Sequence, residues 1–314
     1  MAEVLPRAQP RIGIDSREGI HRHRGLEAGC GEAIAEIESG VAEHERFNPH
    51  SIRGLAVGVG MPNLAATLIS LVGQGHSIEL PVEMESLLAA VPVLEQLRVR
   101  RSAEVPRGVG LPLMSPPAGG DPSRLTVVLD LDETLVHCRL DELDSPSPDF
   151  CVQFEDTDVV GFVYLRPSVM LFIEVAARLF EIVVFTASSQ NYADQVLNRL
   201  DPQQQKIAKR LYRQHCQDTN GTFFKDLREL GRPLDRAVLV DNSPVSLMLC
   251  PDNGVLVSSW TAEQVGDREL LDLLLLLQEC AERPSVQGFL AERYGLAAFQ
   301  QELFRRPESF FVPP

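Results

Sequence analysis

The feature that most constrains the fold is an apolar run that ends in two acidic side chains. Residues 125–129 read Leu-Thr-Val-Val-Leu. Asp130 follows directly, and Asp132 comes after one intervening residue. A continuous β-rich apolar run of this length is typical of a strand buried on both faces of a parallel sheet. Two carboxylates so close together repel one another unless positive charge offsets them. The run therefore predicts a buried strand that ends at a charged site.

Further segments repeat the strand pattern, and helical patterns alternate with them. The strand-like segments are residues 181–187, 236–242 and 254–259. Helical apolar spacing is found in residues 166–180, 191–200, 203–214 and 267–282. Before the third of these helices, Asp201 and Pro202 suit a helix cap and a first turn. Because alternating strands and helices form parallel sheets, we predict an α/β protein with a Rossmann-like parallel sheet covered by helices on both faces.

A change in composition near residue 123 indicates a domain boundary. Residues 107–124 combine Pro, Gly and Ser in the manner of a linker, and the earlier residues show no sustained apolar period. We therefore expect a weakly structured N-terminal region and linker over residues 1–123, one α/β domain over residues 124–298 and a C-terminal tail over residues 299–314.

Net charge and cysteine content disfavour several classes of function. The formal net charge is −15 and the pI is near 4.9, which disfavours nucleic acids and anionic membranes as partners. The six cysteines include no Cys-x-x-Cys pair, so neither a disulfide framework nor a zinc site is expected. The N-terminus lacks the apolar core of a signal peptide, and Gly, Pro and Asn interrupt the apolar residues 54–75. We expect a soluble protein of the nucleus or cytoplasm.

Polar side chains follow three of the predicted strands where each strand ends. Asp130 and Asp132 follow the first strand, Thr186 follows the second, and Asp241 and Asn242 follow the third. Ligands of open parallel sheets bind beyond the carboxyl ends of the strands, so these side chains are expected to converge. Carboxylate and amide oxygens suit Mg²⁺, which would also offset the crowded negative charge.

Two carboxylates spaced i, i+2 at a strand end are able to divide the work of a phosphoryl transfer. One attacks the phosphorus as a nucleophile, and the other protonates the leaving oxygen. The phosphoryl charge also needs a cationic partner. The chain contains only three lysines, Lys206, Lys209 and Lys225. Lys225 lies between the strand-like segments 181–187 and 236–242, so it is the predicted partner.

Five short motifs resemble one enzyme family. The sequences DLDETLVHC, VVFTAS, YRQHC, KDL and VLVDNSP begin at residues 130, 183, 212, 225 and 238. In this order they resemble the haloacid dehalogenase superfamily. More narrowly, they resemble the small phosphatases of the C-terminal domain (CTD) of RNA polymerase II, also called NLI-interacting-factor-like phosphatases, and above all their CTD small phosphatase-like branch. The resemblance covers residues 124–298, and residues 1–123 match no family that we are able to name.

The resemblance implies roles for the strand-end residues. Asp130 would become an aspartyl-phosphate, and Asp132 would act first as general acid and then as general base. Thr186 would donate a hydrogen bond to the phosphoryl oxygens, and Lys225 would neutralise them. The metal ligands for Mg²⁺ would be the Asp130 carboxylate, the Asp132 main-chain carbonyl and the Asn242 side chain, with Asp241 close behind.

The resemblance also implies a groove for a phosphorylated peptide. Arg213 would contact the peptide, and Tyr192 would line the same groove. Residues 139–164 would form a small β insert after the first strand, with a pocket for a proline walled by Phe150, Val152 and Phe154. Two alternatives remain: Arg213 continues a basic helix face, or Tyr192 packs in the core. The chain departs from the family at Leu165, where a lysine is frequent.

Together these features predict a Mg²⁺-dependent phosphoserine/phosphothreonine protein phosphatase. Its substrate would be a proline-containing phosphopeptide such as the RNA polymerase II C-terminal domain. Two other functions stay open: a small-molecule phosphatase of the same superfamily, and a phosphoprotein-binding adaptor without activity. The sequence leaves the oligomeric state unassigned.

Overall fold

The computed structural model describes residues 112–115, 121, 123–143, 146–155, 157–219, 221–264 and 266–295. The predicted N-terminal region and C-terminal tail lie largely outside these residues. Within the described residues, five parallel strands form a sheet in the order β10-β9-β1-β5-β6. Their bounds are β1 Thr126–Leu129, β5 Glu181–Phe185, β6 Ile207–Leu211, β9 Ala237–Asp241 and β10 Gly254–Leu256. The predicted α/β fold with a parallel sheet is confirmed.

Strand β1 lies at the centre of this sheet because it is apolar on both faces. Val127, Val128 and Leu129 are completely buried. β1 pairs in parallel with β5 on one side and with β9 on the other. The chain first adds β5 and β6 on one side and later adds β9 and β10 on the other, so the strand order reverses at β1. Such a reversal is where open parallel sheets bind their ligands.

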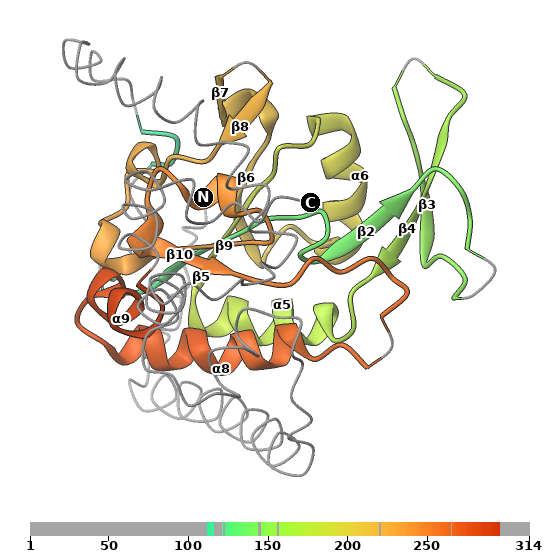
Figure 1. The fold of residues 1–314 in the computed structure, drawn as a ribbon. Helices are drawn as coiled ribbons and strands as arrows, with labels where there is room; N and C mark the ends of the chain where they lie inside the picture. The colour runs from blue at the N-terminus through green and yellow to red at the C-terminus, as the bar shows by residue number, and fades with distance from the viewer. Residues whose placement is uncertain are drawn as a thin grey trace, which may run out of the picture. The chain divides into compact units, whose positions relative to one another are not determined.

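Helices cover the sheet on both faces (Figure 1). α5 (Val169–Leu179) and α8 (Glu269–Glu282) contact each other along one face, and α6 (Gln190–Leu200) lies on the other. In α5 the predicted helical spacing buries Phe172 and Ile173. In the part of the chain that the structure describes, no helix combines the length and the apolar character needed to cross a membrane.

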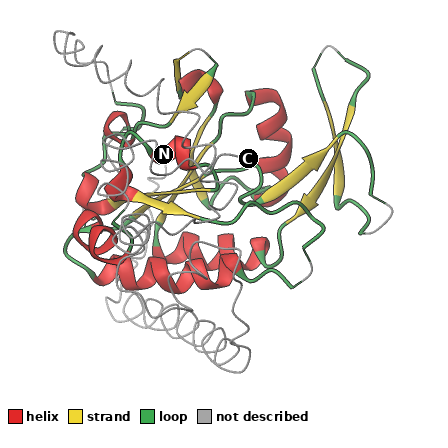
Figure 2. Cartoon of the chain, viewed as in Figure 1, coloured by secondary structure: helices red, strands yellow, loops and turns green. Residues whose placement is uncertain are grey.

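The predicted β insert after the first strand is confirmed as a small antiparallel sheet (Figure 2). Its strands are β2 (Val136–Arg139), β3 (Phe150–Gln153) and β4 (Val160–Leu165), with β4 in the middle. Side chains alternate across β3: Val152 is buried, whereas its neighbour Cys151 is exposed. The residues that come between β1 and α5 in the sequence therefore form a second sheet, separate from the parallel one.

One predicted helix is wrong. Residues 203–214 contain the edge strand β6, which pairs in parallel with β5. The Asp201 carboxylate accepts hydrogen bonds from three following backbone N–H groups, but Gln204 has a φ of 52° and turns the chain out of helical geometry. The buried residues of β6, Ile207 and Leu211, are four apart, and the residues between them are exposed or half-buried. A short edge strand with this burial pattern imitates one face of a helix.

The remaining described elements are short segments between the strands, together with a C-terminal helix. They are η1 Arg213–His215, β7 Gln217–Thr219, β8 Thr222–Phe224, η2 Leu227–Glu229, η3 Leu234–Arg236, α7 Pro244–Leu247, η4 Pro251–Asn253 and α9 Val286–Arg293. Part of the predicted linker packs against η2: Leu113 and Met114 donate backbone hydrogen bonds to the carbonyls of Glu229 and Leu230. The Met114 side chain is buried there.

Candidate active site

A buried lysine between two aspartates forms the centre of the candidate site. Lys225 Nζ lies 2.5 Å from Asp130 Oδ1 and 2.6 Å from Asp241 Oδ2. Lys225, Asp130 and Asp241 are 1%, 7% and 1% exposed. Asp130 follows β1, Asp241 ends β9, and Lys225 follows β8, so three distant segments supply the three charges. The structure thus brings these predicted residues together at the carboxyl edge of the sheet.

The charged groups of this centre shift one another's pKa values. Two nearby carboxylates raise the pKa of Lys225 above its usual range, although burial acts in the opposite direction. Burial and the charges of Asp241 and Asp132 raise the pKa of Asp130 to about 8, against the effect of Lys225. Two carboxylates therefore share one ammonium group, and a third carboxylate, that of Asp132, lies nearby. A second cation at this edge would stabilise the ionised cluster.

Asp132 has a different environment, made of hydroxyl groups. The Tyr192 hydroxyl donates to Asp132 Oδ1 at 2.6 Å, and the Ser188 hydroxyl donates to Asp132 Oδ2 at 2.6 Å. The Thr186 hydroxyl lies 3.5 Å from the same Oδ2 atom and also accepts a hydrogen bond from the Ser188 backbone N–H. Burial raises the pKa of Asp132 despite these hydrogen bonds. A carboxyl group with a raised pKa is suited to donate a proton.

The predicted metal ligands supply hard oxygen atoms. Asn242 Oδ1 lies 3.4 Å from the Thr134 hydroxyl, and the Asn242 amide N–H donates to Ser259 Oγ at 3.0 Å. These two contacts orient the amide oxygen toward the loop that follows β1. Among the described residues, no three His, Cys, Asp or Glu side chains are arranged to hold a metal ion. The predicted set instead combines carboxylates with an amide and a main-chain carbonyl, a donor chemistry that fits Mg²⁺.

Comparison with known proteins identifies the family. A family model described as "NLI interacting factor-like phosphatase" matches residues 125–287. The chain belongs to this family. The resemblance predicted from the five motifs is thereby confirmed.

Relatives within the phosphatase family share about two-fifths of the aligned residues. "CTD small phosphatase-like protein 2" of Dictyostelium discoideum is 38% identical over 185 residues, which cover 59% of this chain and 32% of that protein. "Probable C-terminal domain small phosphatase" of the same organism is 43% identical over 184 residues, covering 58% of this chain and 59% of that protein. The human "Carboxy-terminal domain RNA polymerase II polypeptide A small phosphatase 1" is 37% identical over 199 residues, which cover 62% of this chain and 75% of that protein. The chain thus spans about a third of the first relative and three-fifths of the second.

In this phosphatase-family domain, Arg213 lies beside the segment that follows β5. Its Nε–H donates to the Ala187 carbonyl at 2.6 Å, and its guanidinium group lies 5.3 Å from the centre of the Phe223 ring. Arg213 is exposed and begins η1. The alternative in which Arg213 continues a basic helix face is wrong, because the preceding residues form strand β6.

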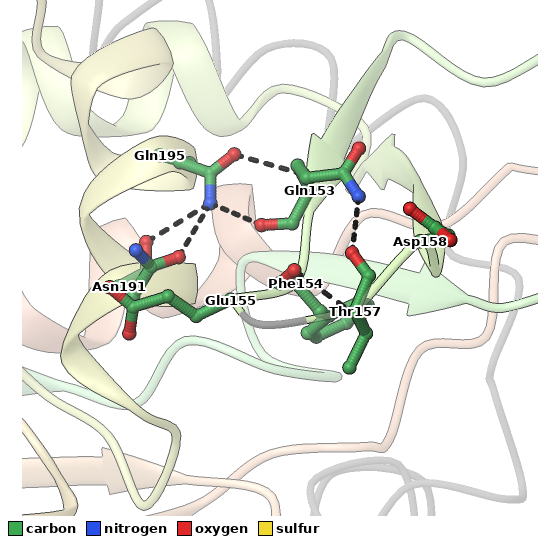
Figure 3. A pocket seen from close by; sticks show the side chains of 7 residues that line it. All are labelled: Gln153, Phe154, Glu155, Thr157, Asp158, Asn191 and Gln195. Atoms are coloured by element: carbon green, nitrogen blue, oxygen red, sulfur yellow. Dashed lines mark hydrogen bonds between the residues drawn. The ribbon is translucent and has the colours of Figure 1, made fainter.

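The predicted groove residues of the insert lie against α6. Phe154 stacks on Tyr192, with ring centres 5.7 Å apart and planes inclined by 10°. Val152 is buried, and Arg199 of α6 lies over Phe150 at 5.4 Å. A pocket of about 540 Å³ lies between the insert and α6 (Figure 3). It is lined by Gln153, Phe154, Glu155, Thr157, Asp158, Asn191 and Gln195.

The surroundings of this pocket are mostly polar. Gln195 of α6 accepts a hydrogen bond from the Gln153 backbone N–H and donates one to the Gln153 carbonyl, as Figure 3 shows. Phe154 lines the pocket, whereas Phe150 and Val152 do not. Of the three residues predicted to wall a proline pocket, only one therefore lines this pocket.

Two residues that contact the site, Ser188 and Arg166, had no role predicted from the sequence. Ser188 was part of the VVFTAS motif, but its hydroxyl partner Asp132 is 56 residues away in the sequence. Arg166 is 1% exposed and donates to the carbonyls of Glu133 and Thr134, the two residues after Asp132. Its guanidinium group also pairs with Asp267 at 2.8 Å. An arginine before a proline is a visible signal, but only the tertiary contacts reveal its partners.

Proposed function

We propose that this protein is a Mg²⁺-dependent phosphoserine/phosphothreonine protein phosphatase that acts through an aspartyl-phosphate. One observation carries the proposal: Asp130 lies in contact with the buried ammonium group of Lys225, and Asp132 lies nearby among hydroxyl groups. A nucleophile, a proton donor and a phosphate-neutralising cation are thus available at one edge. Membership of the phosphatase family supports the same reaction.

In the first step a carboxylate oxygen of Asp130 attacks the phosphorus of the phosphoserine. The new bond joins Asp130 to phosphorus, and the bond between phosphorus and the serine oxygen breaks. Asp132 gives its proton to that leaving oxygen, so serine is released as a neutral hydroxyl. Lys225 and Thr186 stabilise the negative charge on the phosphoryl oxygens.

In the second step water attacks the phosphorus of the aspartyl-phosphate. Asp132, now ionised, takes a proton from this water as the new bond forms. The bond between Asp130 and phosphorus breaks, which releases inorganic phosphate and regenerates the Asp130 carboxylate. Asp132 is again protonated, so the cycle is balanced in protons.

The residues that would hold Mg²⁺ are Asp130, Asp132 through its main-chain carbonyl, and Asn242, with Asp241 beside them. The bound ion would supply positive charge to the phosphoryl oxygens and to the crowded carboxylates. Asp241 also accepts a hydrogen bond from the backbone N–H of Ser243 at 2.8 Å. That bond holds the Asp241 carboxylate in place against Lys225.

The substrate we propose is a phosphorylated protein segment that contains proline. The names of the relatives refer to the RNA polymerase II C-terminal domain or to small phosphatases of it. The insert runs only from β2 to β4 as three short strands, which is small for the separate cap domain of many small-molecule phosphatases. The nuclear or cytoplasmic location expected from the sequence stays a prediction.

Phosphate release from a phosphoserine-proline peptide tests this proposal. We expect release in the presence of Mg²⁺, loss of release with EDTA, and recovery when Mg²⁺ is restored. A set of small phosphorylated metabolites should be hydrolysed more slowly than the peptide. Faster hydrolysis of a metabolite would favour the small-molecule alternative. Binding of the phosphopeptide without any phosphate release would identify an adaptor instead.

A further inference from the structure

Both carboxylate oxygens of Asp132 are engaged by hydroxyl groups from one segment of the chain. Ser188 lies between β5 and α6, and Tyr192 lies in the first turn of α6. Their hydroxyls lie 2.6 Å from Oδ2 and Oδ1 of Asp132, respectively. With a hydrogen bond at each oxygen, the carboxyl group is held against rotation about its terminal torsion angle, which is otherwise broad.

The Tyr192 side chain is itself held in place from two sides. It is 5% exposed, and its ring stacks on Phe154 at the end of β3. Two hydrogen bonds between Gln195 and the Gln153 backbone join α6 to β3 next to this stack. The insert is thereby connected to Asp132 through Phe154 and then through Tyr192.

This arrangement differs from the two roles considered for Tyr192 from the sequence. Ala193, Val196 and Leu197 of α6 are completely buried apolar residues, in keeping with core packing. The Tyr192 ring shares that face, but its hydroxyl donates a hydrogen bond to the carboxylate of Asp132. A groove-lining role alone would require no contact with Asp132.

We propose that Tyr192 and Ser188 are positioning residues that hold the Asp132 carboxyl group in line for proton transfer, and that Phe154 supports Tyr192 in this role. The inference rests on the proposed phosphatase function. Tyr192 and Ser188 keep their own protons throughout, and the transferred proton passes only between Asp132 and the leaving oxygen or the attacking water. A misplacement of about 1 Å at a reacting group costs roughly 10²-fold in rate, so loss of one hydroxyl contact has a measurable effect.

The dependence of the rate on the leaving group separates this role from a general structural one. A serine alkoxide leaves poorly without a proton, whereas nitrophenolate leaves well without one. The test compares the rates of the full-length protein on a phosphoserine peptide and on p-nitrophenyl phosphate. Because Asp132 also acts as general base in the second step, which both substrates share, the comparison is made on the first turnover. Tyr192→Phe and Ser188→Ala should each lower the first-turnover rate on the peptide by about 10-fold to 10²-fold. Each variant should change the burst rate of nitrophenolate release by less than about threefold. Ser188→Thr should restore most of the loss caused by Ser188→Ala.

Tyr212→Phe is a matched control. The Tyr212 hydroxyl also donates to a carboxylate, that of Asp194 at 2.8 Å, but this pair lies outside the proposed machinery. It should leave both activities unchanged. Phe154→Leu, which keeps an apolar side chain but removes the stacked ring, should reproduce the peptide-selective loss in weaker form.

Several outcomes would overturn the inference. Equal losses of the first-turnover rate on both substrates would assign Tyr192 and Ser188 a purely structural role. A rise in KM for the peptide with unchanged kcat would assign Tyr192 to peptide binding alone. Wild-type protein without activity on either substrate would instead reject the proposed function, and the inference with it. The first two outcomes require an active wild-type protein. Failure of the inference is therefore distinguishable from failure of the proposed function.

Discussion

Two aspartates that are separated by one residue occupy contrasting regions of the site. Asp130 contacts the ammonium group of Lys225, which also contacts Asp241. Asp132 accepts hydrogen bonds from the neutral hydroxyls of Ser188 and Tyr192. Burial raises the pKa of both carboxyl groups. At Asp130 the Lys225 ammonium group opposes this effect and favours the ionised form that attacks phosphorus, whereas at Asp132 burial prevails over the neutral hydroxyl donors and favours a carboxyl group that holds a proton. Identical side chains thus acquire different roles from their surroundings.

The two regions also come from different parts of the fold. The Lys225 region is formed at the ends of β1 and β9 in the parallel sheet and at the end of β8, which belongs to a separate two-stranded sheet. The Asp132 region is formed by the segment between β5 and α6, and it reaches the insert through the Phe154 ring. A change in one region should therefore alter one role and spare the other.

The largest effect is expected from removal of the nucleophile. Asp130→Asn keeps the side-chain shape but is a poor nucleophile, so phosphate release should fall on the order of 10⁶-fold on every substrate. Release of phosphate from a phosphopeptide and from p-nitrophenyl phosphate measures this loss. A variant that retains wild-type activity would reject the aspartyl-phosphate mechanism.

The next effect is expected from removal of the proton donor. Asp132→Asn should lower kcat on a phosphoserine peptide by about 10²–10⁴-fold, the usual contribution of general acid–base catalysis. On p-nitrophenyl phosphate the first step should be nearly unaffected, so a phosphoenzyme burst should persist. Rapid-quench measurement of that burst checks the assignment. The contrast between the two regions would disappear if Asp132→Asn abolished the burst as Asp130→Asn does.

Lys225→Met tests the ionic region for both activity and stability. The substitution leaves two buried carboxylates without their ammonium partner, so the free energy of unfolding should fall by about 3–5 kcal/mol. Phosphate release should fall by about 10²–10³-fold, the effect of losing one charge-stabilising group. Urea denaturation and steady-state kinetics measure the two losses.

Lys206→Met is the matched control for this substitution. Lys206 pairs with Glu174 at 2.6 Å, but both side chains are at least 31% exposed. An exposed pair of this kind contributes about 0–1 kcal/mol. A loss of stability as large as that of Lys225→Met would show that burial does not explain the difference.

A small effect on stability alone is expected at a second ion pair outside the site. Glu181, at the start of β5, accepts two hydrogen bonds from Arg232 at 2.8 and 2.9 Å, which hold the Glu181 pKa below its usual range. A lowered folded-state pKa contributes stability above the unfolded value, and this stability is lost as the pH falls through the folded value. Glu181→Gln should lower the free energy of unfolding at pH 7 by about 1 kcal/mol and have less effect at acid pH, with activity unchanged. Urea denaturation at pH 7 and at acid pH measures the loss of unfolding free energy. An equal loss at both pH values would contradict the predicted role of the Glu181–Arg232 pair.

Much of the fold was predictable from short-range patterns. Continuous apolar runs identified β1, β5, β9 and β10, and helical spacing identified α5, α6 and α8, because the burial of these elements is written in their own residues. The failure at residues 203–214 has the same cause: Ile207 and Leu211 are four residues apart in an edge strand, and that spacing is also helical. The pairing of β6 with β5 is a long-range contact that no local window contains.

The sequence by itself determined which residues meet at the carboxyl edge of the sheet, since the polar residues at the strand ends of a parallel sheet share one edge. Tertiary structure alone decided what each aspartate contacts there. Hydroxyl partners for Asp132, the burial of Lys225 between two carboxylates, and the path from the insert through Phe154 to Tyr192 all join side chains that are 16 to 95 residues apart in the chain. Hydrogen bonds and ion pairs depend on separations of a few ångströms, which residue spacing does not specify until the chain has folded.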